Sequence, residues 1–124
     1  MKGLLFILLA ALPILNSCGR FELDFEDEII ARNFYVWMDE NPEENFEIGT
    51  IDASSSFIRI YFQIDSMYPE GAFTVHETEG TVHVANPELF DYEKDTLISG
   101  RVTAYNKDNA KTINVQINLQ DIEE

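Results

Sequence analysis

The stretch FTVHETEGTVHVANPELFDYE, residues 73–93, predicts a β-hairpin that is followed by an acidic corner. Apolar and polar residues alternate over 73–76 and again over 81–84, on either side of residues 77–80. Gly80 readily adopts a positive φ, so the reversal of the chain is placed there. The period of two and the turn together predict two antiparallel strands.

The acidic corner is formed by Asp91 and Glu93, which stand two positions apart. In an extended segment this spacing turns both carboxylates to one side and Lys94 to the other. Two carboxylates on one side, with no base beside them, suit a hard cation such as Ca²⁺, which prefers oxygen ligands. The corner is therefore a candidate metal site.

Strand signals recur through the rest of the chain, separated by polar turns such as DENPEEN and NKDN. The further predicted strands are 33–38, 46–53, 57–64, 96–105 and 111–120. Seven strands, most with one apolar face, predict an all-β fold in which two antiparallel sheets pack face to face. We expect one domain, over residues 33–124.

The N-terminus has a different character. Lys2 precedes an apolar run over residues 4–15, which is too short to span a bilayer stably and predicts a secretory signal peptide, residues 1–17. The run ends in Leu15-Asn16-Ser17-Cys18, which resembles the lipobox of bacterial lipoproteins. In that family signal peptidase cuts before the cysteine, which is then acylated. By position, Cys18 is the residue that matches.

The lipobox resemblance implies a palmitate-type anchor on Cys18 and a bacterial membrane location. We expect the outer membrane, with the domain facing the periplasm or the cell surface. Each buried CH₂ adds about 0.8 kcal/mol, so several acyl chains anchor stably where one does not. Residues 18–32 then form an acidic tether. The alternative is a short amphipathic helix with Phe21, Phe25, Ile29 and Ile30 on one face.

Charge and cysteine content exclude several classes of function. The chain has 23 acids and 8 Lys or Arg, a formal net charge of −15, which argues against nucleic acid and anionic lipid surfaces as partners. Cys18 is the only cysteine, so no internal disulfide braces the fold.

The sequence offers no convincing catalytic group. Ser54-Ser55-Ser56 is a predicted turn and not a nucleophile elbow. A glycosidase pair at Asp91 and Glu93 would need a cleft. We expect no enzymatic activity.

Five motifs in order resemble those of a single cadherin repeat, an immunoglobulin-like domain. They are Glu40-Asn41 followed by Gly49-Thr50-Ile51, Phe73-x-Val75 with Gly80-x-Val82, Phe90-Asp91-Tyr92-Glu93, Val102-x-Ala104-x-Asn106, and the closing Asp121-Ile122-Glu123-Glu124. The resemblance implies a seven-stranded antiparallel Greek-key sandwich. Gly100 stands where that family has a bulky apolar residue, which suggests a bulge.

In the cadherin family, calcium stiffens the junction between successive repeats. The resemblance implies that the ligands here are Glu40, Asp91, Glu93 and Asp121, with Glu123 or Glu124 as further candidates. The acids that the opposite end of a repeat supplies are replaced here by Ser55-Ser56-Phe57 and Asn106. Calcium binding and an acidic end left over from calcium-binding relatives are both open. If the four acids converge, mutual repulsion raises some of their pKa values.

The expected function is a membrane-anchored extracytoplasmic binding or adhesion module, with a protein or cell-surface partner or a second copy of itself. The alternative is a glycan-binding accessory lipoprotein of a nutrient-uptake system. That function would use outward-facing aromatic residues, namely Tyr35 and Trp37 on one strand and Phe57 and Tyr61 on another. Packing of these rings against the tether would instead make them structural.

Overall fold

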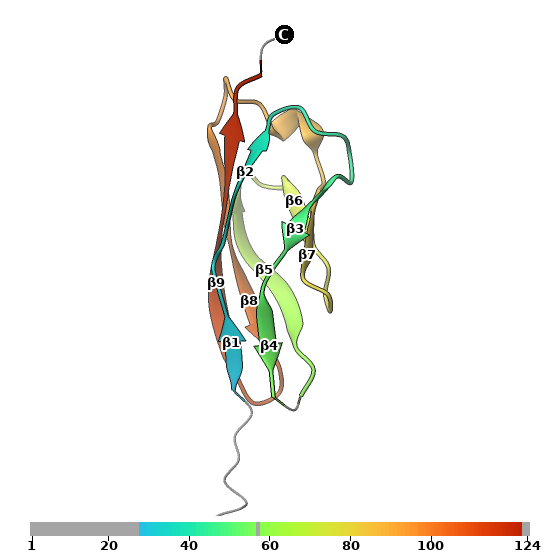
Figure 1. Cartoon of the computed structure of the whole chain (residues 1–124), viewed down its shortest axis with the longest axis vertical. Helices are drawn as coiled ribbons and strands as arrows, with labels where there is room; N and C mark the ends of the chain where they lie inside the picture. Colours follow the sequence, from blue (N-terminus) through green and yellow to red (C-terminus); the bar gives the residue numbers. More distant parts are fainter. Residues whose placement is uncertain (1–27, 57, 123–124) are drawn as a thin grey trace, which may run out of the picture.

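The computed structural model describes residues 28–56 and 58–122, and these residues form a β-sandwich (Figure 1). The strands are β1 (Ile29–Ala31), β2 (Phe34–Asp39), β3 (Glu47–Thr50), β4 (Ala53–Ser55), β5 (Tyr61–Tyr68), β6 (Phe73–Val75), β7 (Thr81–Val84), β8 (Leu97–Tyr105) and β9 (Ala110–Gln120). A short 3₁₀-helix, η2 (Pro87–Leu89), lies between β7 and β8. Within the described ranges, no helix has the length and apolar character that crossing a bilayer requires.

Some residues named in the sequence analysis lie outside the described ranges. They are the signal peptide 1–17, Cys18, Phe21, Phe25, Phe57, Glu123 and Glu124. The signal peptide and the lipidated cysteine therefore stay predictions.

Two sheets form the layers of the sandwich. The larger sheet has the strand order β2-β9-β8-β5 and the smaller has the order β3-β7-β6, while β1 and β4 form a short ladder beside β3 (Figure 1). The all-β sandwich predicted from the sequence is confirmed. The described residues contain nine strands where seven were expected, because β1 is an additional strand and residues 51–52 divide the predicted strand 46–53 into β3 and β4.

One pairing departs from the antiparallel pattern, because the start of the chain changes sheets. β1 pairs antiparallel with β4, whereas β2 pairs in parallel with β9. Of the two residues that connect β1 to β2, Arg32 contacts the β3–β4 connection and Asn33 contacts the larger sheet. The Arg32 N–H donates to the Asp52 carbonyl at 3.0 Å, and the Asn33 side-chain oxygen accepts the Asn114 N–H at 2.9 Å. The crossing therefore ties the two layers together at this end.

β1 lies within residues 18–32, the stretch that the sequence analysis describes as a tether. Ile29 is 1% exposed and belongs to the core, whereas its neighbour Ile30 is 65% exposed. Adjacent side chains on opposite faces are typical of a strand, so these two residues do not form part of the amphipathic helix that was the alternative. The sandwich therefore begins before residue 33.

The core lies between the two sheets and follows the predicted alternation. On β9 the inward residues Ile113, Val115, Ile117 and Leu119 are at most 2% exposed, and the residues between them face outward. The largest buried side chains are Phe73 from the hairpin and Phe90 from the acidic corner. Both ends of the stretch 73–93 are thus fixed in the core.

The hairpin turn forms at the predicted glycine. Gly80 has a φ of +74°, and a Cβ there would lie 2.9 Å from the Phe62 ring. The conformation and the close approach both require glycine at this position. The His76 N–H donates to the Thr81 carbonyl at 2.8 Å and closes the turn.

Gly100 has a packing reason that the sequence did not reveal. A Cβ on this residue would lie 2.9 Å from both the Phe73 ring and the Ser66 carbonyl oxygen. The expected irregularity is present on the partner strand, where the β5–β8 register shifts between Ile64 and Ser66. The Phe73 ring thus occupies the space that a side chain on residue 100 would need.

Candidate functional site

Three chain segments meet at the end of the sandwich where β2 and β9 finish. The Glu40 N–H donates to the Gln120 carbonyl at 3.2 Å, which extends the β2–β9 pairing by one step. The next residue, Asn41, donates its N–H to the Phe90 carbonyl at 3.0 Å. Since Phe90 is fully buried, it fixes the acidic corner against this end of the two strands. We call this end the acidic tip, and it carries Glu40, Asp91, Glu93 and Asp121.

Glu40 is a buried carboxylate that holds the acidic tip together. Its side chain is 2% exposed, and each of its oxygens accepts one backbone N–H. Oε1 accepts from Tyr92 at 3.0 Å, and Oε2 accepts from Ile122 at 3.1 Å. Hydrogen bonds to an ionised acceptor are stronger than neutral ones, and they offset the cost of burying the charge. Glu40 therefore links the end of β2 to two segments that follow it by 52 and 82 residues.

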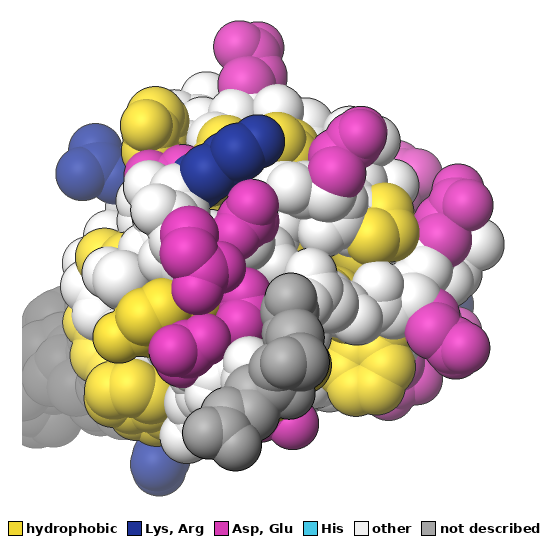
Figure 2. Space-filling view, turned by 90° about the horizontal axis from the view of Figure 1, so that it is seen from above, with side chains coloured by type: hydrophobic (Ala, Val, Ile, Leu, Met, Phe, Trp, Pro, Cys, Tyr) yellow, Lys and Arg dark blue, Asp and Glu magenta, His cyan; other side chains and the backbone are white. Residues whose placement is uncertain are grey.

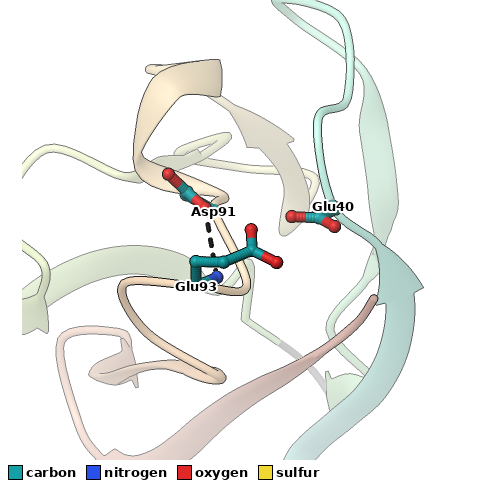
Figure 3. Close-up of side chains that lie close together, drawn as sticks. All are labelled: Glu40, Asp91 and Glu93. Atoms are coloured by element: carbon teal, nitrogen blue, oxygen red, sulfur yellow. Dashed lines mark hydrogen bonds between the residues drawn. The ribbon is translucent and has the colours of Figure 1, made fainter. Parts of the chain in front are cut away.

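Asp91 and Glu93 meet through a turn and not through the extended segment that the sequence predicted. Asp91 Oδ1 accepts the Glu93 N–H at 3.1 Å, and the Asp91 carbonyl accepts the N–H groups of Lys94 and Asp95, both at 3.0 Å (Figure 3). This local bonding is typical of aspartate at a turn. The extended geometry was wrong, although the two carboxylates do lie close together.

The carboxylates of Glu40, Asp91 and Glu93 converge. One oxygen from each of the three lies within 4.8 Å of the others, and in Figure 3 the Glu93 carboxylate lies between the other two. Figure 2 shows acidic side chains gathered at the centre of this end of the molecule. Asp121 is close enough to act on the pKa values of both glutamates. All four predicted residues are therefore neighbours.

The pKa values of Glu40 and Glu93 shift in opposite directions. The backbone N–H groups of Tyr92 and then Ile122 hold the pKa of Glu40 below its usual value of 4.5. Loss of hydration raises the pKa of Glu93, and the hydrogen bond with Asp91 and the negative charges of Glu40 and Asp121 add to this rise. Repulsion among the acids was predicted to raise some of their pKa values, and Glu93 is the residue whose pKa is raised.

The opposite end of the sandwich carries no comparable group. In the part of the chain that the structure describes, the tip is the one place where three acidic, histidine or cysteine side chains are close enough to share a metal ion. Asn106 instead uses its side-chain oxygen to accept the N–H groups of Asp108 and Asn109, at 3.0 and 2.9 Å. It holds a turn, as the sequence predicted for residues 106–109.

Comparison with known proteins places the fold. No family model matches this sequence, and no curated protein matches it either. Solved structures do match. The chain superposes on cadherin domains 1–5 of protocadherin gamma B2 with a TM-score of 0.69 and 15% identity, covering 80% of this chain and 21% of that one. For domains 1–4 of protocadherin gamma B7 the values are 0.68, 12%, 78% and 25%.

A single-domain structure also matches. The third cadherin domain of human protocadherin 7 superposes with a TM-score of 0.64 and 15% identity, covering 77% of this chain and 87% of that one. The chain therefore spans about one domain, and a quarter or less of the multi-domain structures. At these identities the likeness shows the fold, so the cadherin-like architecture that the sequence predicted is confirmed.

The geometry of Glu40 generates a pH prediction. Because the folded-state pKa of Glu40 is lowered, its stabilising effect is complete above the unfolded value near 4.5 and is lost as the pH falls through the folded value. Glu40→Gln cannot accept both N–H groups. At pH 7 we expect it to lower the melting temperature by about 5 °C or more.

The difference between wild type and Glu40→Gln should then narrow below pH 4.5. Thermal unfolding followed by circular dichroism from pH 3 to pH 7 measures it. Glu79→Gln, an exposed glutamate at the hairpin turn, is the matched control and should change little at any pH. A difference that is equally large at pH 3 and pH 7 would show that ionised Glu40 does not act in this way.

Proposed function

We propose that this chain is a membrane-anchored extracytoplasmic binding module, and that its acidic tip holds a calcium ion through which it contacts a second protein or another copy of itself. The convergence of Glu40, Asp91 and Glu93 carries the proposal. This convergence lies at one end of a sandwich that has the cadherin fold. We infer a role in binding and not in catalysis.

The polarity of the sandwich supports this orientation. In Figure 1 the described chain begins at the β1 end and leaves beyond β9 at the opposite end, where the acidic tip lies. A lipid anchor at Cys18, as the lipobox-like segment predicts, would precede β1 by ten residues of sequence. The tip would then point away from the membrane surface and toward a partner.

The residues at the tip fit calcium. Ca²⁺ takes about six to eight oxygen ligands at about 2.3–2.6 Å, and carboxylates are its usual protein ligands. An ionised carboxylate has roughly four lone-pair positions, so the two N–H bonds that Glu40 accepts leave capacity for a metal. Loss of hydration raises the pKa of Glu93, and the hydrogen bond with Asp91 and the negative charges of Glu40 and Asp121 add to this rise, which a nearby cation would oppose.

The tip alone does not complete a calcium coordination shell. Glu40, Asp91 and Glu93 supply three carboxylates, and Asp121 is adjacent. Water or a partner molecule must supply the remaining oxygens. A partly complete site of this kind favours an ion held at an interface. The partner's oxygens then strengthen calcium binding, and the calcium ion strengthens binding of the partner.

Calorimetric titration of calcium into the chain from residue 19 onward tests the metal. We expect saturable heat and a higher melting temperature, with stabilisation of about 2.7 kcal/mol at a free calcium concentration one hundred times Kd. Asp91→Asn should abolish the heat. Glu93→Gln should raise the melting temperature without calcium, because it removes a carboxylate whose ionisation opposes folding, and should weaken calcium binding.

Glu79→Gln again serves as the control, since its carboxylate belongs to the hairpin turn and not to the tip. The absence of heat at millimolar calcium, or heat that survives Asp91→Asn, would exclude the tip as a calcium site. Sedimentation of the calcium-loaded protein then separates the two kinds of partner, because self-association raises the measured mass and a foreign partner does not.

The anchor is tested separately in bacterial cells that express the full chain. Labelled palmitate should be incorporated into the wild-type protein, which should sediment with the membrane fraction. Cys18→Ser should lose the label and leave the membrane fraction, because no other residue of the chain can be acylated through sulfur. Label that persists in Cys18→Ser would contradict the lipoprotein assignment.

A further inference from the structure

The outer face of the larger sheet has a side-chain pattern that the acidic tip does not explain. This face is turned away from the smaller sheet (Figure 1). The strand register places one row of outward residues across all four strands, in the order Tyr35, Gln116, Ser99 and Tyr68. A tyrosine thus stands on each edge strand, with an amide and a hydroxyl between them.

The neighbouring rows have the same chemistry. On one side, Trp37 of β2 lies opposite Asn118 of β9, which lies opposite Leu97 of β8. On the other side, Asn114 of β9 lies opposite Arg101 of β8. The three rows contain aromatic rings, amides, hydroxyls and one guanidinium, and no carboxylate. In a chain with 23 acids, this is an unusually uncharged area.

The middle of this face is hollowed. An open hollow of about 320 Å³ is lined by residues that include Tyr68, Ser99, Gly100, Arg101, Asn114 and Gln116. The hollow exists because the side chains of Ser66 and Ser99 are small. Gly100 has no side chain, and a Cβ on it would point toward Phe73 and not into the hollow. The hollow is therefore lined by groups that donate and accept hydrogen bonds, with a ring at its edge.

Three aromatic side chains in these rows are exposed, and one of them, Tyr68, lines the hollow. The exposed fractions are 55% for Tyr35, 69% for Trp37 and 61% for Tyr68. Adjacent strands are about 4.8 Å apart, so Tyr35 and Tyr68 stand about 14 Å apart across the sheet, and Trp37 lies about 7 Å along the strand from Tyr35. A ligand that contacts all three rings must be extended. Tyr61 faces the same side of the sheet but lies outside these three rows, opposite Tyr105 of β8, with the two ring centroids 6.0 Å apart.

Arg101 is available to such a ligand. In the part of the chain that the structure describes, it forms no salt bridge, although acids outnumber bases almost three to one in the chain. Its guanidinium offers a fork of N–H donors that fits two neighbouring oxygens. The nearest acid along β5, Asp65, instead accepts hydrogen bonds from Gln63 and Thr103.

The charge balance argues against charged polymers as the ligand. A polyanion would be repelled by a protein with a net charge of −15, and a polycation would find its complement at the acidic tip and not on this face. The remaining match is a neutral, extended chain rich in hydroxyl groups. Its hydroxyls would bond to the amides and Arg101, and its C–H faces would stack on the aromatic rings.

We propose that the outer face of the β2-β9-β8-β5 sheet binds an extended neutral polysaccharide, through Tyr35, Trp37 and Tyr68 as stacking rings and Gln116, Asn114 and Arg101 as hydrogen-bonding groups. Trp37 borders the acidic tip, because it lines a hollow with Glu40 and Ile122, but the other groups of this site lie away from the tip and the binding does not depend on calcium. It gives the anchored module a second ligand.

Native gel electrophoresis tests the proposal with the chain from residue 19 onward, which contains all the strands that the structure describes. The gels contain a soluble β-glucan, an α-glucan, a mannan or, as the acidic comparison, hyaluronan. We expect at least one neutral polysaccharide to retard the protein, with Kd rising tenfold or more in Trp37→Ala and in Tyr68→Ala. Retardation should persist when calcium is chelated.

Two controls keep the result specific. Ile30→Ala removes an apolar side chain of 65% exposure on β1, which is not part of this sheet, and Asp91→Asn changes the acidic tip, so both should bind as wild type does. Melting temperatures check that every variant is folded. The proposal is overturned if no neutral polysaccharide retards the protein, if hyaluronan alone does, or if Tyr35→Ala combined with Tyr68→Ala still binds normally. The first of these outcomes would leave the face as a protein-docking surface.

Discussion

The structure of the acidic tip depends on one buried carboxylate that bonds to the backbone of two distant segments. Glu40 accepts the N–H of Tyr92 from the acidic corner and the N–H of Ile122 from the end of the chain. A buried charge is costly unless it is hydrogen-bonded, so removing either donor would leave the carboxylate short of a partner. The position of the corner and the exit of the chain are therefore coupled through a single side chain.

This coupling explains why the other acids are held close together. The backbone N–H groups stabilise ionised Glu40, and its fixed negative charge adds to the loss of hydration and the Asp91 hydrogen bond that raise the pKa of Glu93. Repulsion of this kind would normally push exposed acids apart. The turn that Asp91 makes with Glu93, and the burial of Phe90 beside it, keep them in place. A cation would relieve the repulsion among these carboxylates, which is the physical basis of the calcium proposal.

The sequence predicted the sandwich well because its signals are local. Alternation on β9 and the hairpin glycine each depend on a few neighbouring residues, and both were confirmed, as was the fold that the cadherin-like motifs implied. The crossing of the chain between β1 and β2 was missed, because a three-residue strand such as β1 carries little periodicity. The packing of Phe73 on Gly100 was missed for another reason, since it joins residues from different strands. Nothing in the local sequence records such a contact.

The sequence predicted which residues form the site but not how they are held together. The family resemblance brought Glu40, Asp91, Glu93 and Asp121 together, whereas the argument from residues alone found Asp91 and Glu93 and assigned them an extended geometry that is wrong. That Glu40 is a buried acceptor of two N–H groups could not be predicted, because its partners lie 52 and 82 residues away.

The most direct test of the role of Glu40 is a pH titration followed by nuclear magnetic resonance of the backbone amides. The amide signals of Tyr92 and Ile122 should move together, with one midpoint below 4.5, while the Val84 amide, which bonds to the Phe46 carbonyl, should not follow them. Amides of Tyr92 and Ile122 that do not titrate, or that titrate with different midpoints, would contradict the central role of Glu40.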